Sequence, residues 1–464
     1  MGHLMKRRYF LLFPFCFFVF YLPNIPVPSD FHWHDSQRVG QILLITYAVI
    51  FGTFFGIFEI GNKIFLYVLF LIFLGLISAC LSNFPIWSLT EMAIFLGSYA
   101  LGVFLYHIFC VDYENAERYS FFILFLTAFS LSFYFVVAYI SSFFIDNKFD
   151  VWQLINGFSN PRFFGQFLTL LLPVLLAPVL QKNRWSKVFF ILSCMVCFML
   201  VASGTRGSLL GIGSVIAIYA LLNKLSRQWM LLMLEIACIA FMMQYILIGV
   251  LPDYFQMTVQ NDAFDRELVG LSAREVLWEK SISMVIERPF FGFGPMHFAN
   301  MPDVIASHPH QLFLQILSEW GILFSLIFLY FLLKVIYLIV KELISFERIK
   351  GENSRIIYVC LSASIIASLM QSMVDGVFVM PYTEIIFVFM AAWLTAVYHG
   401  RGKCSVDGVL SIHGCIINII FIFSACVLIY SFVEKSPTYI GKSQENYYKN
   451  KSFLKPRFWI NGGF

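Results

Sequence analysis

The chain has little charge for its length: charged residues make up 12% of its 464 positions, whereas hydrophobic residues make up 60%. A water-soluble protein carries roughly twice that charged fraction, about 25%. The composition therefore excludes an ordinary globular enzyme and indicates a protein embedded in a membrane. The formal net charge of +4 is small and spread along the chain, so it predicts no surface for nucleic acid.

The sequence also lacks a disulfide framework. Of its ten cysteines, Cys404 lies in a polar loop and the others lie inside apolar runs. None lies in the two large polar segments, where a secreted domain would be cross-linked. Cys194 and Cys197 have the spacing of a redox or metal motif, but inside an apolar helix we interpret them as packing residues.

Long apolar runs are abundant. Windows of about 20 apolar residues, the length that crosses a bilayer as a helix, predict an all-α polytopic membrane protein with about 12–13 transmembrane helices. The windows lie at residues 9–22, 41–60, 64–82, 88–111, 120–144, 163–181, 187–204, 208–223, 229–251, 312–340, 356–374, 382–399 and 411–432. No cleavage site of small residues follows the first window, so we interpret it as an anchor span rather than a signal peptide.

Lys and Arg cluster in alternate loops, which orients the bundle. With the N-terminus in the cytoplasm, cytoplasmic loops and helix ends carry Lys6, Arg7, Arg8, Lys63, Arg118, Lys182, Arg184, Lys187, Lys224, Arg227, Lys341, Arg348, Lys350, Arg355, Arg401 and Lys403. The short loops on the other side carry only Arg38, Lys148, Arg162 and Arg206. We expect four parts: an N-terminal transmembrane bundle (1–251), one large outer loop with an amphipathic helix (252–311), C-terminal transmembrane helices (312–432) and an outer tail (433–464).

The outer loop is the chemically dense part of the chain. SAREVLWEKSISMVIERP, residues 272–289, predicts a helix with Ser272 as N-cap, Glu275 as its capping-box partner and Pro289 at its end. Its apolar side predicts that it lies on the bilayer or on other helices. FFGFGPMHF then turns the chain tightly ahead of SHPHQLFLQILSEWG, where the next span begins.

Two stretches resemble the bacterial O-antigen ligase and O-antigen polymerase superfamily, which includes pilin-type protein O-oligosaccharyltransferases. ASGTRGSLLG, residues 202–211, places an arginine among small residues at an outer turn. RPFFGFGPMHF with HPHQLFLQILSEWGIL is similar to the family's loop, which ends in histidine, then Asn, Ser or Gln, nine residues and glycine. In this sequence those positions are His310, Gln311 and Gly321. Phe324 departs from the family pattern, and we expect it to affect helix packing.

The resemblance covers residues from about 150 to 375 and implies a glycosyltransferase at the periplasmic face of the bacterial inner membrane. Family members take a glycan from an undecaprenyl-diphosphate carrier and pass it to an acceptor hydroxyl. The acceptor is lipid A core, a growing glycan chain or a protein such as a pilin, and the sequence leaves these open. We expect an inverting transfer that needs no metal and no other cofactor.

The donor's diphosphate is an anion, and arginine offers it a fixed charge with a planar pair of donors. Arg206 is the first candidate for this role. Arg274 and Arg288 are also candidates, but one helix would separate them by about 21 Å. Either the helix breaks before Arg288, or only one of the two reaches the phosphates. Arg162 can bind glycan or phosphate. The plainer interpretations are a snorkelling arginine for Arg206 and helix-end charges for Arg274 and Arg288.

The acceptor hydroxyl must lose its proton during attack, and an imidazole with a pKa near 6.5 suits this task. His310, where the loop meets a span, is the predicted catalytic base. His308 is expected to be an accessory substrate-binding residue, and Asp375 to orient His310 or an arginine. The alternatives are solvent-facing histidines, or a metal site made by His297, Asp303, His308 and His310 without regular ligand spacing.

Two other classes of protein compete with an enzyme. A transporter or flippase fits the number of spans, but it would show repeated halves and charge at the bilayer midplane. The sequence shows no internal repeat, and its charge gathers on one side. A membrane scaffold would not need the arginines and histidines. The basic, aromatic tail KSPTYIGKSQENYYKNKSFLKPRFWINGGF either contacts an acceptor or packs on the outer loop.

Overall fold

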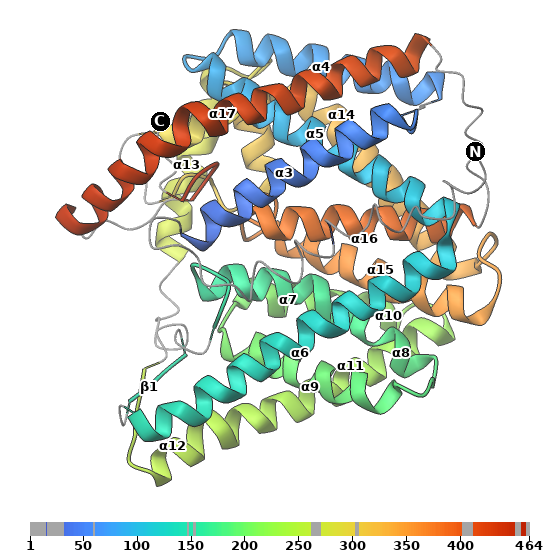
Figure 1. Ribbon diagram of the computed structural model, residues 1–464, viewed down its shortest axis with the longest axis vertical. Coiled ribbons are helices and arrows are strands. Elements are labelled where there is room, and N and C mark those ends of the chain that lie inside the picture. Colours follow the sequence, from blue (N-terminus) through green and yellow to red (C-terminus); the bar gives the residue numbers. More distant parts are fainter. Residues whose placement is uncertain are drawn as a thin grey trace.

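The computed structural model describes residue 15 and residues 32–58, 61–145, 148–151, 155–260, 271–301, 306–400, 412–450 and 456–460. These residues form a bundle of helices (Figure 1). The helices are α3 (Trp33–Phe54), α4 (Asn62–Cys80), α5 (Pro85–Val111), α6 (Tyr113–Ile145), α7 (Pro161–Leu175), α8 (Ala177–Leu180), α9 (Ser186–Ala202), α10 (Arg206–Ala220), α11 (Lys224–Met243), η4 (Gln244–Val250), α12 (Leu251–Tyr254), α13 (Leu271–Glu287), η5 (His297–Asn300), α14 (Leu312–Ser345), α15 (Glu352–Gln371), α16 (Pro381–His399) and α17 (Ile412–Asn450). Strands β1 (Lys148–Asp150) and β2 (Thr258–Gln260) pair in parallel.

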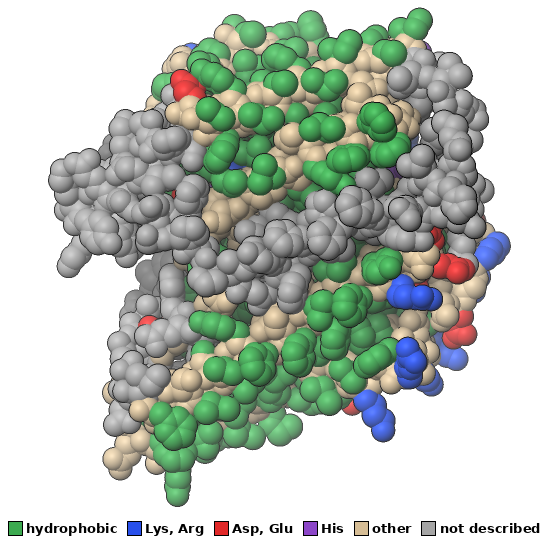
Figure 2. Space-filling model, in the orientation of Figure 1, with side chains coloured by type: hydrophobic (Ala, Val, Ile, Leu, Met, Phe, Trp, Pro, Cys, Tyr) green, Lys and Arg blue, Asp and Glu red, His purple; other side chains and the backbone are tan. Residues whose placement is uncertain are grey.

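Nine helices in the described part of the chain are long and apolar enough to cross a membrane, and three shorter apolar helices accompany them. Exposed side chains on these helices are largely Phe, Leu, Ile, Val and Tyr, and the space-filling view shows them covering the flanks of the bundle (Figure 2). The prediction of an all-α polytopic membrane protein is confirmed. The expected first span, residues 9–22, lies outside the described residues apart from Phe15.

The bundle has two ends with different side chains. α15 lies inside the bundle and packs against α7, α10 and α16, and α16 packs in turn against α3 and α5. One end gathers the starts of α3, α7, α10, α14 and α16 with the last turn of α15, and we call it the histidine end because His310 lies there. Lys and Arg side chains gather at the edge away from α13 (Figure 2), which we call the basic end.

The start of α3 differs from the expectation. The sequence placed Arg38 in a short outer loop, ahead of a span expected from residue 41, but α3 begins at Trp33 and Arg38 lies in its second turn. Arg38, counted among the outer-loop arginines, is 3% exposed, and its guanidinium donates to the backbone oxygens of Val379 and Phe458. The loop prediction is wrong because partners from distant segments offset the cost of burying these polar groups.

α14 is interrupted at Gly321, which has φ 80° and ψ 171°. A Cβ at this position would lie 2.3 Å from a backbone oxygen of the preceding loop, so the site requires glycine. The loop also satisfies the backbone groups around the break: Ile322 N donates to Pro289 O at 2.8 Å, and Gly294 N donates to Glu319 O at 2.9 Å. Since lipid offers no such partners, the loop ahead of the histidines is part of the helix packing.

Candidate active site at the histidine end

His310 lies at the junction between the outer loop and α14. Gln311 is the N-cap of α14, and Leu312 N donates to the carbonyl oxygen of Ser372 at 3.0 Å. These contacts hold the start of α14 against the turn that follows α15, where Asp375 lies. The imidazole Nδ1 of His310 is 3.7 Å from Asp375 Oδ1. The structure thus brings together two residues that the sequence predicted as parts of one site.

The backbone of His310 is held in an uncommon conformation. Its φ of 55° is left-handed, which costs a residue other than glycine about 1–2 kcal/mol. His308 supports this conformation, because its Nδ1 accepts a hydrogen bond from His310 N at 3.2 Å. His308 is 2% exposed and its ring packs on Gly376. Burial lowers the pKa of His308 well below its ordinary value, and the charges of His310 and Arg457 lower it further. The imidazole of His308 is therefore a neutral support, and substrate binding by it stays a prediction.

Asp375 is buried but kept ionised. Its Oδ1 accepts a hydrogen bond from Gly376 N at 2.9 Å, and Gln371 Nε2 lies 3.4 Å from its Oδ2. Burial by itself would raise the pKa of Asp375, but the nearby His310 and the Gly376 N–H hold the pKa below its ordinary value. Gln371 also donates to Ser208 Oγ at 3.0 Å, which links this carboxylate to the first turn of α10.

Arg206 is the first residue of α10, and its side chain is exposed. A Cβ on the next residue, Gly207, would lie 3.5 Å from Asp375 Oδ2, which is an ordinary van der Waals contact. The start of α10 therefore lies in contact range of the carboxylate. This arrangement places the backbone of Arg206 beside the pair formed by Asp375 and His310, with its guanidinium on the outside of the bundle.

Arg162 belongs to the neighbouring turn. It is exposed in the first turn of α7, whose N-cap Asn160 accepts a hydrogen bond from Arg162 N. The turn before α10 packs directly on this one, because Thr205 Oγ1 donates to Pro161 O at 3.3 Å and a Cβ at Gly165 would overlap Thr205. Arg162 and the turn that carries Arg206 therefore lie side by side at the histidine end.

Arg274 lies on α13 near the histidine segment. Trp278, one turn later on the same face of α13, donates from Nε1 to Pro309 O at 3.1 Å. The backbone between the two histidines is thus tied to the helix that carries Arg274, whose side chain is half-buried.

Arg288 is placed differently. The predicted helix is present, but α13 ends at Glu287, so the helix breaks before Arg288 as Pro289 permits. Arg288 Nη1 donates to Leu81 O at 3.2 Å, and its guanidinium lies 4.6 Å from the ring centre of Phe293. These contacts fix the loop against the turn after α4. The side chain of Ser272, expected to cap this helix, is not among the side chains that the structure describes.

Sequence reasoning missed a buried charge cluster near the start of α14. It consists of the buried residues Arg38, Glu319, Glu384 and Arg457 and of Glu91, whose side chain is 21% exposed. Arg457, from the C-terminal tail, is 1% exposed; its Nη2 lies 2.6 Å from Glu319 Oε2 and 3.2 Å from Glu91 Oε1. Burial would lower the pKa of Arg457, but these two carboxylates raise it, so it stays charged. The signals in the sequence were the acids Glu91, Glu319 and Glu384, which lie inside predicted spans, since an acid inside a span needs a partner.

The described residues contain no group of three or more His, Cys, Asp or Glu arranged to hold a metal ion. Asp303, a member of the alternative metal site, lies outside them. His297 is buried between the rings of Phe84 and Phe293. Burial lowers the pKa of His297 to about 4, and the charge of Arg288 adds to this effect.

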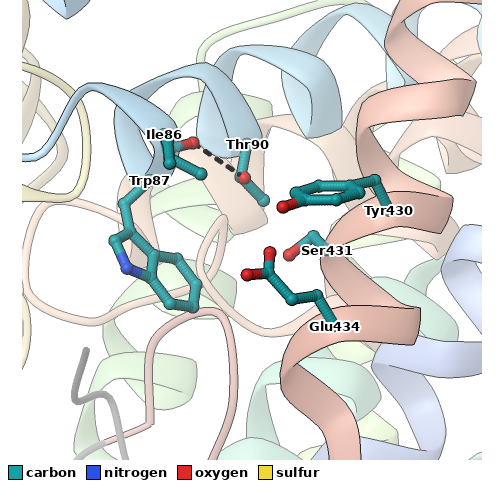
Figure 3. A pocket seen from close by; sticks show the side chains of 6 residues that line it. All are labelled: Ile86, Trp87, Thr90, Tyr430, Ser431 and Glu434. Atoms are coloured by element: carbon teal, nitrogen blue, oxygen red, sulfur yellow. Dashed lines mark hydrogen bonds between the residues drawn. The ribbon is translucent and has the colours of Figure 1, made fainter.

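A pocket lies at the same end of the bundle, between the start of α5 and α17 (Figure 3). Trp87 and Glu434 face each other across it, with Tyr430 beside the carboxylate. None of the residues predicted for the site lines this pocket, but Trp87 contacts Phe458 of the tail, with ring centres 6.2 Å apart.

The geometry fits proton transfer beside an anion. Nδ1 of His310 faces Asp375, so Nε2 is the nitrogen that can take a proton from another molecule. A carboxylate at Nδ1 then stabilises the imidazolium that forms. Arg206 and Arg162 add fixed positive charge at the same end, and guanidinium groups suit phosphate oxygens.

Residues 188–329 match a family model described as O-Antigen ligase. The match extends from α9 to α14 and so contains the broken helix and the outer loop. Among the predicted site residues it contains Arg206, Arg274, Arg288, His308 and His310, whereas Arg162 and Asp375 lie outside it. No curated protein and no solved structure matches the chain.

Proposed function

Because residues 188–329 match a family model described as O-Antigen ligase, we propose that the protein is an O-antigen ligase-like glycosyltransferase. It transfers a glycan from undecaprenyl diphosphate to an acceptor hydroxyl, on lipid A core or on a protein such as a pilin. The observation that carries the proposal is the pair formed by His310 and Asp375 beside the exposed arginines of α7 and α10, with His310 itself inside the family match.

In the proposed reaction His310 Nε2 takes the proton of the acceptor hydroxyl, while the hydroxyl oxygen attacks the anomeric carbon of the donor. The bond from that carbon to the diphosphate oxygen breaks, and the electron pair leaves with undecaprenyl diphosphate. Arg206 and Arg274 stabilise the leaving charge, and Arg162 binds glycan or phosphate from the adjacent turn. We favour Arg274 over Arg288, which is engaged with Leu81 and Phe293. Attack opposite the leaving group inverts the anomeric centre, and no step needs a metal or another cofactor.

The proposed location is the bacterial inner membrane with the histidine end in the periplasm. Exposed Lys and Arg side chains at the basic end support this orientation, because basic residues accumulate on the cytoplasmic side. In this orientation the four expected parts of the chain place the loop 252–311 and the tail 433–464 outside the cytoplasm. The donor's diphosphate then lies at headgroup level, beside the first turns of α7 and α10.

The test is glycan transfer in membranes supplied with an undecaprenyl-diphosphate glycan, offering lipid A core and a pilin-like protein side by side. We expect wild type to modify one of the acceptors, and His310→Ala at equal protein level to lower the rate by about 10²–10⁴-fold. His399→Ala, which removes an exposed histidine at the basic end, is the matched control and should keep full transfer.

The other outcomes identify the alternatives. Longer glycan chains without transfer to either acceptor would assign the protein to the O-antigen polymerases. If neither product nor polymer forms, but the lipid-linked glycan changes its side of the membrane, the protein is a flippase. Full transfer by His310→Ala would remove His310 from the mechanism.

A further inference from the structure

The C-terminal tail reaches into the bundle directly behind the segment that carries His310. Its residues Arg457, Phe458, Trp459 and Ile460 are each at most 3% exposed. Ile460 N donates to the side chain of Asp35 in α3 at 2.7 Å. A tail that only contacted an acceptor outside the bundle would not bury a guanidinium or form hydrogen bonds with α3.

Arg457 contacts one face of the first segment of α14, from Leu312 to the break at Gly321. Its Nη2 lies 2.6 Å from Glu319 Oε2, and with the Gln315 amide oriented to accept, both Nη atoms donate to it at 3.0 Å. Gln315 and Glu319 are four residues apart and so share a helix face. This segment begins two residues after His310 and ends at the break at Gly321. Because α14 is interrupted at Gly321, the segment is not held by an unbroken helix beyond that residue. Side-chain contacts such as those of Arg457 therefore hold it in place.

Arg38 connects the same tail to the turn that carries Asp375. Its guanidinium donates to Arg457 O at 3.1 Å and Phe458 O at 3.0 Å, and Nη2 also donates to Val379 O at 3.0 Å. Val379 N in turn donates to Gly376 O, next to Asp375. The tail thus lies between the two segments whose relative position sets the distance from His310 to Asp375.

We propose that Arg457 is a positioning residue, which locks the first segment of α14 and, together with Arg38, fixes His310 against Asp375. The inference rests on the proposed function for its catalytic consequence, but its structural part can be measured without it. Arg457 acts through Glu319 and Gln315 and is too buried to touch a substrate.

The experiment compares Arg457→Met, the double variant Arg457→Met with Glu319→Gln, and the matched control Arg184→Met, an exposed arginine at the basic end. The double variant leaves no fully buried unpaired carboxylate, because Glu319 is replaced and the side chain of Glu91, the other partner of Arg457, is 21% exposed to solvent. A glutamine oxygen at position 319 can still accept the hydrogen bond from Phe298 N that Glu319 accepts now. It therefore separates loss of the clamp from the cost of a buried unpaired charge.

Two quantities are measured: hydrogen exchange of peptides covering residues 308–320, and kcat and KM for glycan transfer. We expect exchange of these peptides to rise at least tenfold in both Arg457 variants and to stay at the wild-type rate in Arg184→Met. We expect kcat to fall at least tenfold with the donor KM within twofold of wild type, and the double variant to recover thermal stability without recovering kcat.

Wild-type exchange of these peptides in Arg457→Met would overturn the proposal, and so would wild-type kcat in a stable double variant. If wild-type protein transfers no glycan at all, the proposed function fails, and a rise in exchange in Arg457→Met would still establish the clamp.

Discussion

Two pairs of arginines at the same end of the bundle differ in burial. Arg38 and Arg457 are 3% and 1% exposed, and their N–H groups bond to backbone oxygens, Gln41, Gln315 and the buried carboxylates. Arg162 and Arg206 are exposed in the first turns of α7 and α10. A buried guanidinium is out of reach of a substrate, whereas an exposed one is accessible from outside the bundle. Burial, and not the presence of arginine, therefore separates residues that hold the site from residues that can bind a donor.

The largest effect should come from breaking the buried pair at Arg38. We expect Arg38→Met to lower the free energy of unfolding by about 3–5 kcal/mol, because it leaves Glu384 without its cation and three backbone oxygens without a donor. The measurement is the thermal unfolding midpoint of purified protein in detergent, with Arg184→Met as the control. An unchanged midpoint would mean that Arg38 does not hold the tail.

The exposed pair should affect activity and not stability. We expect Arg206→Ala to lower the transfer rate by about 10–100-fold, which corresponds to roughly 1.5–3 kcal/mol for a hydrogen bond to a charged group. Arg206→Lys should recover only part of this, because an ammonium does not replace a planar fork. The unfolding midpoint should stay at the wild-type value in both variants. A lowered midpoint with normal transfer would reverse the assignment.

Burial also predicts how stability responds to pH. In the folded protein the pKa of His297 is about 4, whereas in the unfolded chain the same imidazole takes up a proton near pH 6.5. The unfolded state therefore binds more protons between these values, and stability falls as pH decreases through this window, by up to about 1.4 kcal/mol per pH unit for this one group. His297→Gln should lose less stability than wild type between pH 7.5 and 5.5, measured by thermal unfolding. Equal losses would contradict a neutral buried imidazole.

The smallest effect is expected at Arg162. Since its side chain is exposed and a lysine preserves the charge, Arg162→Lys should lower the transfer rate less than about fivefold, or less than about 1 kcal/mol. A loss as large as that of Arg206→Ala, measured in the same membranes, would show that Arg162 makes a planar contact with the donor.

The sequence predicted the class of fold because helices in lipid are encoded locally, by about 20 apolar residues each. It also predicted a helix within residues 272–289, observed as α13 (Leu271–Glu287), whose end before Pro289 follows from local backbone sterics. Phe324 packs against Phe95 and Trp320, as expected for a packing residue. These features depend on neighbours in the sequence, so a single chain is enough to identify them.

The rest depends on contacts between distant segments. Gly321 stood out only by its place in a motif. The structure requires glycine there because the backbone has a positive φ and packs against the loop at Pro289, which is a tertiary contact. Arg38 was assigned to a loop, because no local signal shows that its guanidinium bonds to the backbone oxygens of Val379 and Phe458. Arg457 was equally hidden, since its acid partner lies 138 positions earlier in the chain. The roles of His310, Asp375, Arg206 and Arg274 stay predictions that the geometry supports.

The pairing of Arg457 with Glu319 also sets an order of assembly during synthesis. A ribosome adds about 5–20 residues per second, so Glu319 enters the membrane on the order of ten seconds before Arg457 exists. During that interval Glu319 lacks this partner, and the helical segment behind His310 has no clamp. The site is therefore completed only after the helices around it have been inserted, and a nascent chain that has not yet produced Arg457 holds the residues of the proposed reaction in an unfinished arrangement.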